Sequence, residues 1–198
     1  MSGIDEPSSG IRLTMVRADL AGLPAAVLPE GFALRDFRDG DEQAWIDIHI
    51  PADPHHQFDL KCYRGEFGED RDEIRRRQIF LCEPAGRPIG TVTAWFDAAR
   101  GPAWGRIHWV AIAPPWQGRG LSKPMLAAAC RRLRDLGHTR AVLTTQTVRP
   151  RAVGLYLRFG FAPEIATPAD TAAWRLVATR LRPDLAAAVG EYLGGAEQ

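Results

Sequence analysis

A glycine-containing turn is the stretch of this sequence best suited to chemistry. It spans residues 117–122 and reads Gln-Gly-Arg-Gly-Leu-Ser. Gly118 and Gly120 leave the backbone uncovered, so an anion could come close to the main-chain N–H groups. A helix that begins here would add its free N–H groups and its dipole, and both favour negative charge. Because Arg119 and Lys123 add positive charge, the turn predicts a binding loop for a pyrophosphate group. We call residues 117–122 the phosphate loop.

Two regular elements must position this loop. Before it, the stretch from residue 107 is an apolar run rich in Ile, Val and Trp, typical of a buried strand, and Pro114 and Pro115 end that strand. After it, the spacing of the apolar residues predicts an amphipathic helix, and Gly137 stands where its C-cap is expected. The apolar stripe of this helix consists of Leu121, Met125, Leu126, Ala129, Cys130, Leu133 and Leu136.

The loop and a second block downstream resemble the GCN5-related N-acetyltransferases. The loop resembles the family pattern Gln/Arg-x-x-Gly-x-Gly/Ala, with Ser122 at its last position. Residues 151–161 resemble the family segment that ends Leu-Tyr-x-x-x-Gly-Phe. The resemblance extends over roughly residues 31–180. It implies acetyl-CoA as co-substrate and an α/β fold, a twisted mixed sheet of about six or seven strands with helices on both faces.

The resemblance also implies which residues contact acetyl-CoA. Backbone N–H groups near Ile112 would polarise the acetyl carbonyl, and Val110 would bond the pantetheine arm. Arg149 replaces an Asn that is frequent in the family, and it either reaches the phosphates or is solvated. The cofactor-binding residues implied are Val110, Ala111, Ile112, Gln117, Gly118, Arg119, Gly120, Leu121, Ser122 and Arg149.

Tyr156 is the candidate proton donor. It matches the family position whose phenol commonly protonates the coenzyme A thiolate. A phenol has an ordinary pKa of about 10, close to that of an alkyl thiol. The competing interpretation is an amphipathic core tyrosine with a satisfied hydroxyl group.

His108 is the candidate general base for the acceptor amine. Alternation along the strand predicts that Arg106, His108 and Val110 share one face, which looks into the cleft in this family. Imidazole has an ordinary pKa of about 6.5 and can accept a proton near neutral pH. The competing interpretation is a satisfied core histidine. The alternative bases are His49, His55, Glu66 and Glu69.

Neither a metal site nor a disulfide is expected. Asp53, His55, His56 and Asp59 are too loosely spaced for a typical metal site. The three cysteines (Cys62, Cys82 and Cys130) have no C-x-x-C spacing, which favours reduced thiols in the cytoplasm.

Composition excludes two classes of partner. The 25 Lys and Arg residues against 24 Asp and Glu residues give a net charge of +1, which provides no electrostatic footprint for nucleic acid. No apolar run approaches the roughly 18 residues that cross a membrane. The first ten residues lack the apolar centre of a secretory signal, so a cytoplasmic protein is expected.

The remaining pattern predicts a single domain over residues 31–198, with a helical extension from about residue 183. Residues 1–30 would form an arm or contribute an extra edge strand at residues 11–16. The cleft is expected where two central strands splay near Ile112 and Thr144. Strands are expected at residues 32–37, 78–82, 89–96, 106–113, 141–147 and 174–179, and helices after residue 39 up to Pro51 and at residues 64–77, 121–136, 151–159 and 183–193.

The resulting hypothesis is direct transfer of an acetyl group from acetyl-CoA to a primary amine. A small-molecule acceptor is favoured over a peptide or protein amine, and the chain would be a monomer or homodimer. The alternative is a non-catalytic acyl-CoA sensor. A nucleotide-binding protein is a weaker alternative, because the loop has neither the G-x-x-x-x-G-K-[ST] nor the G-x-G-x-x-G pattern in the required context.

Overall fold

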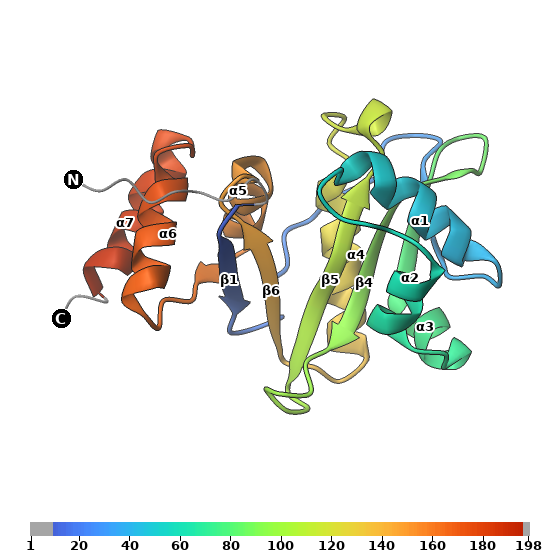
Figure 1. Cartoon of the computed structure of the whole chain (residues 1–198), viewed down its shortest axis with the longest axis horizontal. Helices are drawn as coiled ribbons and strands as arrows, with labels where there is room; N and C mark the ends of the chain where they lie inside the picture. Colours follow the sequence, from blue (N-terminus) through green and yellow to red (C-terminus); the bar gives the residue numbers. More distant parts are fainter. Residues whose placement is uncertain (1–9, 196–198) are drawn as a thin grey trace. The chain divides into compact units, whose positions relative to one another are not determined.

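The computed structural model describes residues 10–195 of the 198-residue chain. The chain divides into two compact units, one formed by Leu20–Ala141 and one by the segments before and after it. Seven strands and seven α-helices lie within the described residues (Figure 1). The predicted α/β class with six or seven strands is confirmed.

The unit of residues 20–141 is built on four antiparallel strands. They follow the order β2-β3-β4-β5. The sequence-predicted hairpin is confirmed as β3 and β4, and every residue of β3 is buried. The strands are β2 (Ala33–Asp36), β3 (Gln78–Cys82), β4 (Pro88–Phe96) and β5 (Trp104–Ile112).

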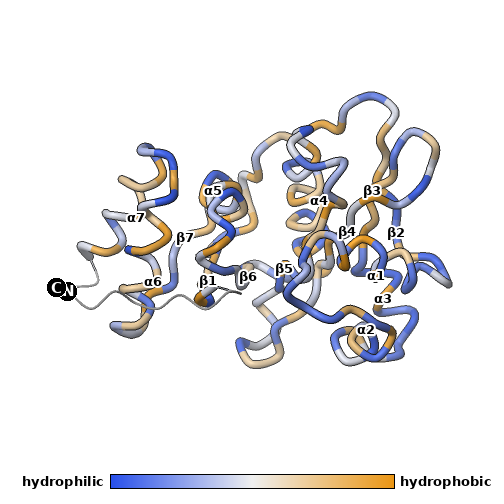
Figure 2. Tube along the Cα trace, turned by 45° about the horizontal axis from the view of Figure 1, so that its top comes forward, coloured by the Kyte–Doolittle hydropathy of each residue, from blue (hydrophilic) through white to orange (hydrophobic). Residues whose placement is uncertain are grey.

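Helices cover both faces of these four strands, as predicted. Helix α4 (Ser122–Asp135) packs on the face where Met125 lies against Gly90 of β4. Hydrophobic and hydrophilic segments both occur along the trace of α4 (Figure 2), and residues 125–130 are all apolar. The predicted stripe of α4 is buried at Met125, Leu126, Ala129, Cys130 and Leu133.

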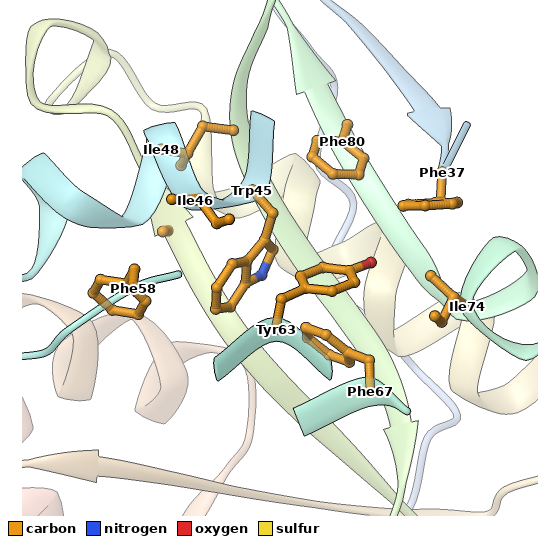
Figure 3. Packing of buried hydrophobic residues seen from close by; sticks show 10 residues of the cluster. Phe37, Trp45, Ile46, Ile48, Phe58, Tyr63, Phe67, Ile74 and Phe80 are labelled. Atoms are coloured by element: carbon orange, nitrogen blue, oxygen red, sulfur yellow. The ribbon is translucent and has the colours of Figure 1, made fainter. Parts of the chain in front are cut away.

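An aromatic core fills the opposite face, where helix α1 (Asp41–Ala52) and helix α2 (Leu60–Phe67) pack. Trp45 of α1 is completely buried, and the rings of Phe58, Tyr63 and Phe67 surround it (Figure 3). The full cluster consists of Phe37, Trp45, Ile46, Ile48, Phe58, Tyr63, Phe67, Ile74, Phe80 and Ala111.

Strand β5 contains an irregularity that alternation along the sequence did not predict. Thr93 lies opposite His108, but Thr91 lies opposite Ala111, so β5 has one residue more than β4 in this interval. Trp109 adopts φ +47°, a left-handed conformation that a bulky side chain rarely takes. The prediction that Arg106, His108 and Val110 share one face is therefore wrong for Val110. Because of the bulge, Ala111 rather than Val110 shares the face of His108.

The charged region before β3 forms two short helices rather than the single helix expected at residues 64–77. Helix α2 ends at Phe67, because Gly68 takes φ +70°. Asp70 then caps helix α3 (Arg71–Arg77), because its side chain accepts hydrogen bonds from the N–H groups of Asp72 and Glu73.

The other unit contains the strands β1 (Arg12–Arg17), β6 (Arg140–Gln146, of which residues 142–146 belong here) and β7 (Ala162–Pro163), in the order β6-β1-β7. The strand expected at residues 11–16 therefore exists. It has a neighbour on each side, so it is not an edge strand. Strand β7 pairs antiparallel with β1. The helices of this unit are α5 (Pro150–Arg158), α6 (Pro168–Ala178) and α7 (Pro183–Gly195).

The strand predicted at residues 174–179 is wrong, because residues 168–178 form helix α6. Thr167 and Asp170 make a reciprocal capping box at its start, and Pro168 occupies its first turn. Trp174 and Val177, three residues apart, are fully buried on one face of this helix. The helix start signal and the buried face outweigh the strand tendency of this short apolar run.

None of the helices in residues 10–195 combines the length and apolar character needed to cross a membrane.

Candidate active site

The phosphate loop has the backbone geometry that its glycines predict. Gly118 and Gly120 have φ values of +76° and +77°, where any other residue would be strained. No atom lies within 4 Å of the position that a Cβ would occupy at either glycine. The space in front of the loop backbone is therefore open, which suits the close approach of a phosphate group.

Strand β5 and the 3₁₀ turn that follows it (η1, Pro114–Trp116) hold the loop in place. The Ala113 N–H donates to Ile89 O at 2.8 Å, and the Gln117 side chain donates to Ile112 O at 2.8 Å. The amide of Gln117 thus ties the loop to the end of β5.

The charged side chains of the loop are accessible. The Arg119 guanidinium lies 4.7 Å from the ring centroid of Trp116, a cation–π contact that restrains it near the loop. Arg119 and Lys123 are exposed. Among the described residues, no side chain caps the start of α4, so the N–H groups of its first turn remain available to an anion.

A second polar group lies on the α2 side of β5. Glu66 Oε2 is 2.9 Å from His108 Nε2 and also 2.9 Å from Trp109 Nε1. The hydrogen bond with His108, helped by that from Trp109, holds the pKa of Glu66 below its ordinary value, although burial acts in the opposite direction. Glu66 therefore carries its negative charge at neutral pH.

Aromatic rings surround this group. The Phe67 ring lies 5.8 Å from the His108 ring, and the His56 ring lies 5.3 Å from Trp109. The Cys62 thiol is 3.8 Å from His56 Nε2. Burial, followed by the charge of Glu66, raises the pKa of this thiol, so Cys62 is protonated at neutral pH.

The other sequence-predicted bases lie in different surroundings. His49 is buried in the aromatic core, and its Nδ1 lies 2.8 Å from Trp45 O. His55 and Glu69 are exposed on the segments that flank α2. Among residues 10–195, no three His, Cys, Asp or Glu side chains are grouped to hold a metal ion. Of the candidate bases, the structure thus brings together only His108 and Glu66.

Tyr156 and Arg149 belong to the other unit. Tyr156 lies on α5, is 7 % exposed and packs edge-on against Phe161, with ring centroids 6.1 Å apart. Arg149 is the N-cap residue of α5, and its backbone N–H donates to Gln146 O at 3.0 Å. The Arg149 carbonyl accepts hydrogen bonds from Ala152 and Val153. Within their own unit, Arg149 therefore stands at the start of the helix that carries Tyr156.

Comparison with known proteins decides the family. The model of the acetyltransferase (GNAT) family matches residues 38–161, which include the phosphate loop, His108 and Tyr156. The chain belongs to the GNAT acetyltransferase family. The phosphate loop and the two candidates for proton transfer, His108 and Tyr156, therefore lie within the part of the chain that matches the family.

Other GNAT proteins resemble most of the chain. It is 34% identical over 157 residues to the mycothiol acetyltransferase of Pseudarthrobacter chlorophenolicus, an alignment that covers 76% of this chain and 48% of that protein. The corresponding protein of Thermobispora bispora is 32% identical over 70% of this chain and 49% of its own length. The chain thus spans about half the length of the curated relatives it matches.

Solved structures show the same GNAT fold. A GCN5-related N-acetyltransferase from Sphaerobacter thermophilus has a TM-score of 0.64 and 23% identity over 77% of this chain and 48% of that protein. A Mycobacterium tuberculosis protein solved in complex with CoA and NLQ has a TM-score of 0.52 and 19% identity, covering 82% of this chain and 88% of its own. The acyl-CoA N-acyltransferase fold implied by the motifs is confirmed.

Proposed function

We propose that this chain transfers the acetyl group of acetyl-CoA directly to the primary amine of a small molecule. The observation that carries the proposal is the phosphate loop, whose two glycines expose the backbone in front of the uncapped start of α4. A small acceptor is supported by the relatives that are named mycothiol acetyltransferases.

The loop and the end of β5 would bind and orient acetyl-CoA. The N–H groups of residues 118–123 would hold the pyrophosphate, with Arg119 and Lys123 adding charge. The backbone of β5 at Val110, Ala111 and Ile112 would align the pantetheine arm and polarise the acetyl carbonyl. Arg149 would either bind the phosphates of acetyl-CoA or have no direct contact with the cofactor.

Two side chains would move the protons of the reaction. His108 would take a proton from the acceptor amine as its nitrogen bonds to the acetyl carbon. Tyr156 would give its phenolic proton to the sulfur as the carbon–sulfur bond breaks. The reaction therefore needs no covalent bond between the acetyl group and the protein.

Gly120→Val is expected to weaken acetyl-CoA binding about tenfold to a hundredfold. Valine is strained at φ +77° and fills the open space in front of the loop, so the change costs at least one hydrogen bond to a charged group. Isothermal titration calorimetry measures the change. Gly86→Val is the matched control, because Gly86 has φ +86° and open space but lies in the turn between β3 and β4. Equal loss of affinity in both variants would contradict a specific role for the loop.

Tyr156→Phe is expected to lower kcat at least about tenfold and to leave acetyl-CoA binding nearly unchanged. Phenylalanine keeps the packing against Phe161 but has no proton to donate. Steady-state assays of coenzyme A release, together with calorimetry, separate the two effects. Full turnover in this variant would remove Tyr156 from the mechanism.

The function itself is tested by release of free coenzyme A from acetyl-CoA in separate wells that contain small amines, antibiotics or short peptides. We expect release in a small-amine or antibiotic well. Release with peptides alone would overturn the proposed acceptor class. Binding of acetyl-CoA without release in any well would favour a non-catalytic sensor, and absence of binding would contradict the role of the loop.

A further inference from the structure

We propose that Glu66 is a positioning residue that fixes the His108 imidazole in the tautomer whose Nδ1 accepts the proton of the acceptor amine. This inference rests on the proposed function, because it assigns the atom of His108 that acts as the base. Its evidence is the geometry that joins Glu66, His108 and Trp109.

The hydrogen bond between Glu66 and His108 determines which ring nitrogen carries the proton. An ionised carboxylate only accepts hydrogen bonds, so the nitrogen 2.9 Å from Glu66 Oε2 must be the donor. That nitrogen is Nε2. A neutral imidazole has a single N–H, and its other nitrogen, Nδ1, therefore keeps the lone pair that can accept a proton. The His108 and Glu66 side chains are 18% and 35% exposed, so the pair is partly shielded from water.

The bulge in β5 explains why two neighbouring residues contact the same carboxylate oxygen. Successive side chains of a regular strand point to opposite faces of the sheet. His108 and Trp109 are adjacent, yet His108 Nε2 and Trp109 Nε1 each lie 2.9 Å from Glu66 Oε2. The extra residue in β5 and the φ of +47° at Trp109 bring both rings to the side of α2. The unfavourable backbone conformation of Trp109 thus accompanies the hydrogen bond from its indole N–H to Glu66.

Trp109 orients Glu66 in turn. Its indole N–H donates to the oxygen that faces His108, so the carboxylate cannot rotate away without losing two hydrogen bonds. Helix α2 is also held firmly at this point, because Tyr63 and Phe67 are 1% and 3% exposed in the aromatic core. The tautomer of His108 is therefore set by a carboxylate that is held in place by the Trp109 hydrogen bond and by the packing of α2.

The position of Glu66 within α2 is not explained by helix stability. Glu66 is the penultimate residue of α2, where the helix dipole disfavours a negative charge. Its hydrogen bonds run to the strand rather than to a neighbouring Lys or Arg of the same helix. This placement is expected of a residue whose role is to orient the His108 imidazole.

The test is Glu66→Gln, studied by ¹⁵N NMR of the histidine rings and by steady-state kinetics. The chain has five histidines, and the signal lost in His108→Gln assigns His108. At alkaline pH, we expect wild-type His108 to be protonated at Nε2 alone. Glutamine can donate as well as accept, so Glu66→Gln should populate the other tautomer and lower kcat about tenfold or more, with KM for acetyl-CoA unchanged.

Two further variants protect this test against a folding artefact. Trp109→Phe keeps an aromatic ring but lacks the indole N–H, and it should shift the tautomer ratio in the same direction by a smaller amount. Glu191→Gln, an exposed position on α7, is the matched control and should behave as wild type.

The outcomes separate this inference from the proposed function. An unchanged tautomer in Glu66→Gln would overturn the positioning role, even if the wild-type protein transfers acetyl groups. An altered tautomer with full turnover would also overturn it. If the wild-type protein transferred to no amine, the proposed function would fail, and the NMR result would still decide whether Glu66 sets the tautomer.

Discussion

Replacing His108 by glutamine is expected to lower kcat about a hundredfold or more, the typical effect of losing a general base. Glutamine can still donate a hydrogen bond to Glu66, which lies 2.9 Å from His108 Nε2, so the local packing should persist. It cannot accept a proton from an amine at neutral pH. Acetyl-CoA binding should change little, because His108 faces α2 rather than the phosphate loop. Rapid-mixing or steady-state assays of coenzyme A release measure kcat, and calorimetry measures binding.

Two results would contradict the role of His108. Full turnover in His108→Gln would mean that the amine loses its proton to solvent before it enters the site. Loss of turnover in His55→Gln, with His108→Gln active, would move the base to the exposed segment before α2. A parallel loss of kcat and of acetyl-CoA affinity would point to a structural defect instead.

Trp45→Ala is expected to lower the free energy of unfolding by about 3–5 kcal/mol. Trp45 is 0% exposed, and the rings of Phe58, Tyr63 and Phe67 lie 5.5, 5.3 and 5.7 Å from it in edge-to-face contacts (Figure 3). Alanine would leave a cavity that these packed rings cannot fill. Urea denaturation with linear extrapolation measures the loss.

Trp45→Phe is the matched variant and is expected to lose much less stability. Trp45 Nε1 is buried and has no hydrogen-bond partner among the described residues, so phenylalanine removes an unfavourable polar group while keeping an aromatic ring. Equal losses in the two variants would show that the full indole, rather than an aromatic ring, is required at this position.

The phosphate loop and α4 could be predicted because their signals are local. Glycines at positions 118 and 120 are required by left-handed φ values within the turn itself. The apolar repeat of α4 matches its buried stripe, since the helical period alone determines which residues share a face. The strands β3 to β5 followed from similarly short-range patterns.

The strand predicted at residues 174–179 failed because a short apolar run is compatible with either period. Helix α6 starts at its capping box, before the apolar run begins. Once the helix has formed, Trp174 and Val177 lie on the same buried face. Thr167 and Asp170 held the local signal that could have identified this helix, since their spacing is that of a capping box.

By itself, the sequence indicated the phosphate loop from residue types at short spacing, and the loop and residues 151–161 carried the resemblance to the family. That resemblance in turn made His108 and Tyr156 candidates for proton transfer. Only the tertiary structure decided which partner His108 has. Glu66 lies 42 residues before His108 in the chain. Their contact depends on the packing of α2 against the aromatic core and on one extra residue in β5. This register shift depends on how β4 and β5 pack together, so it cannot be predicted from the sequence of either strand alone.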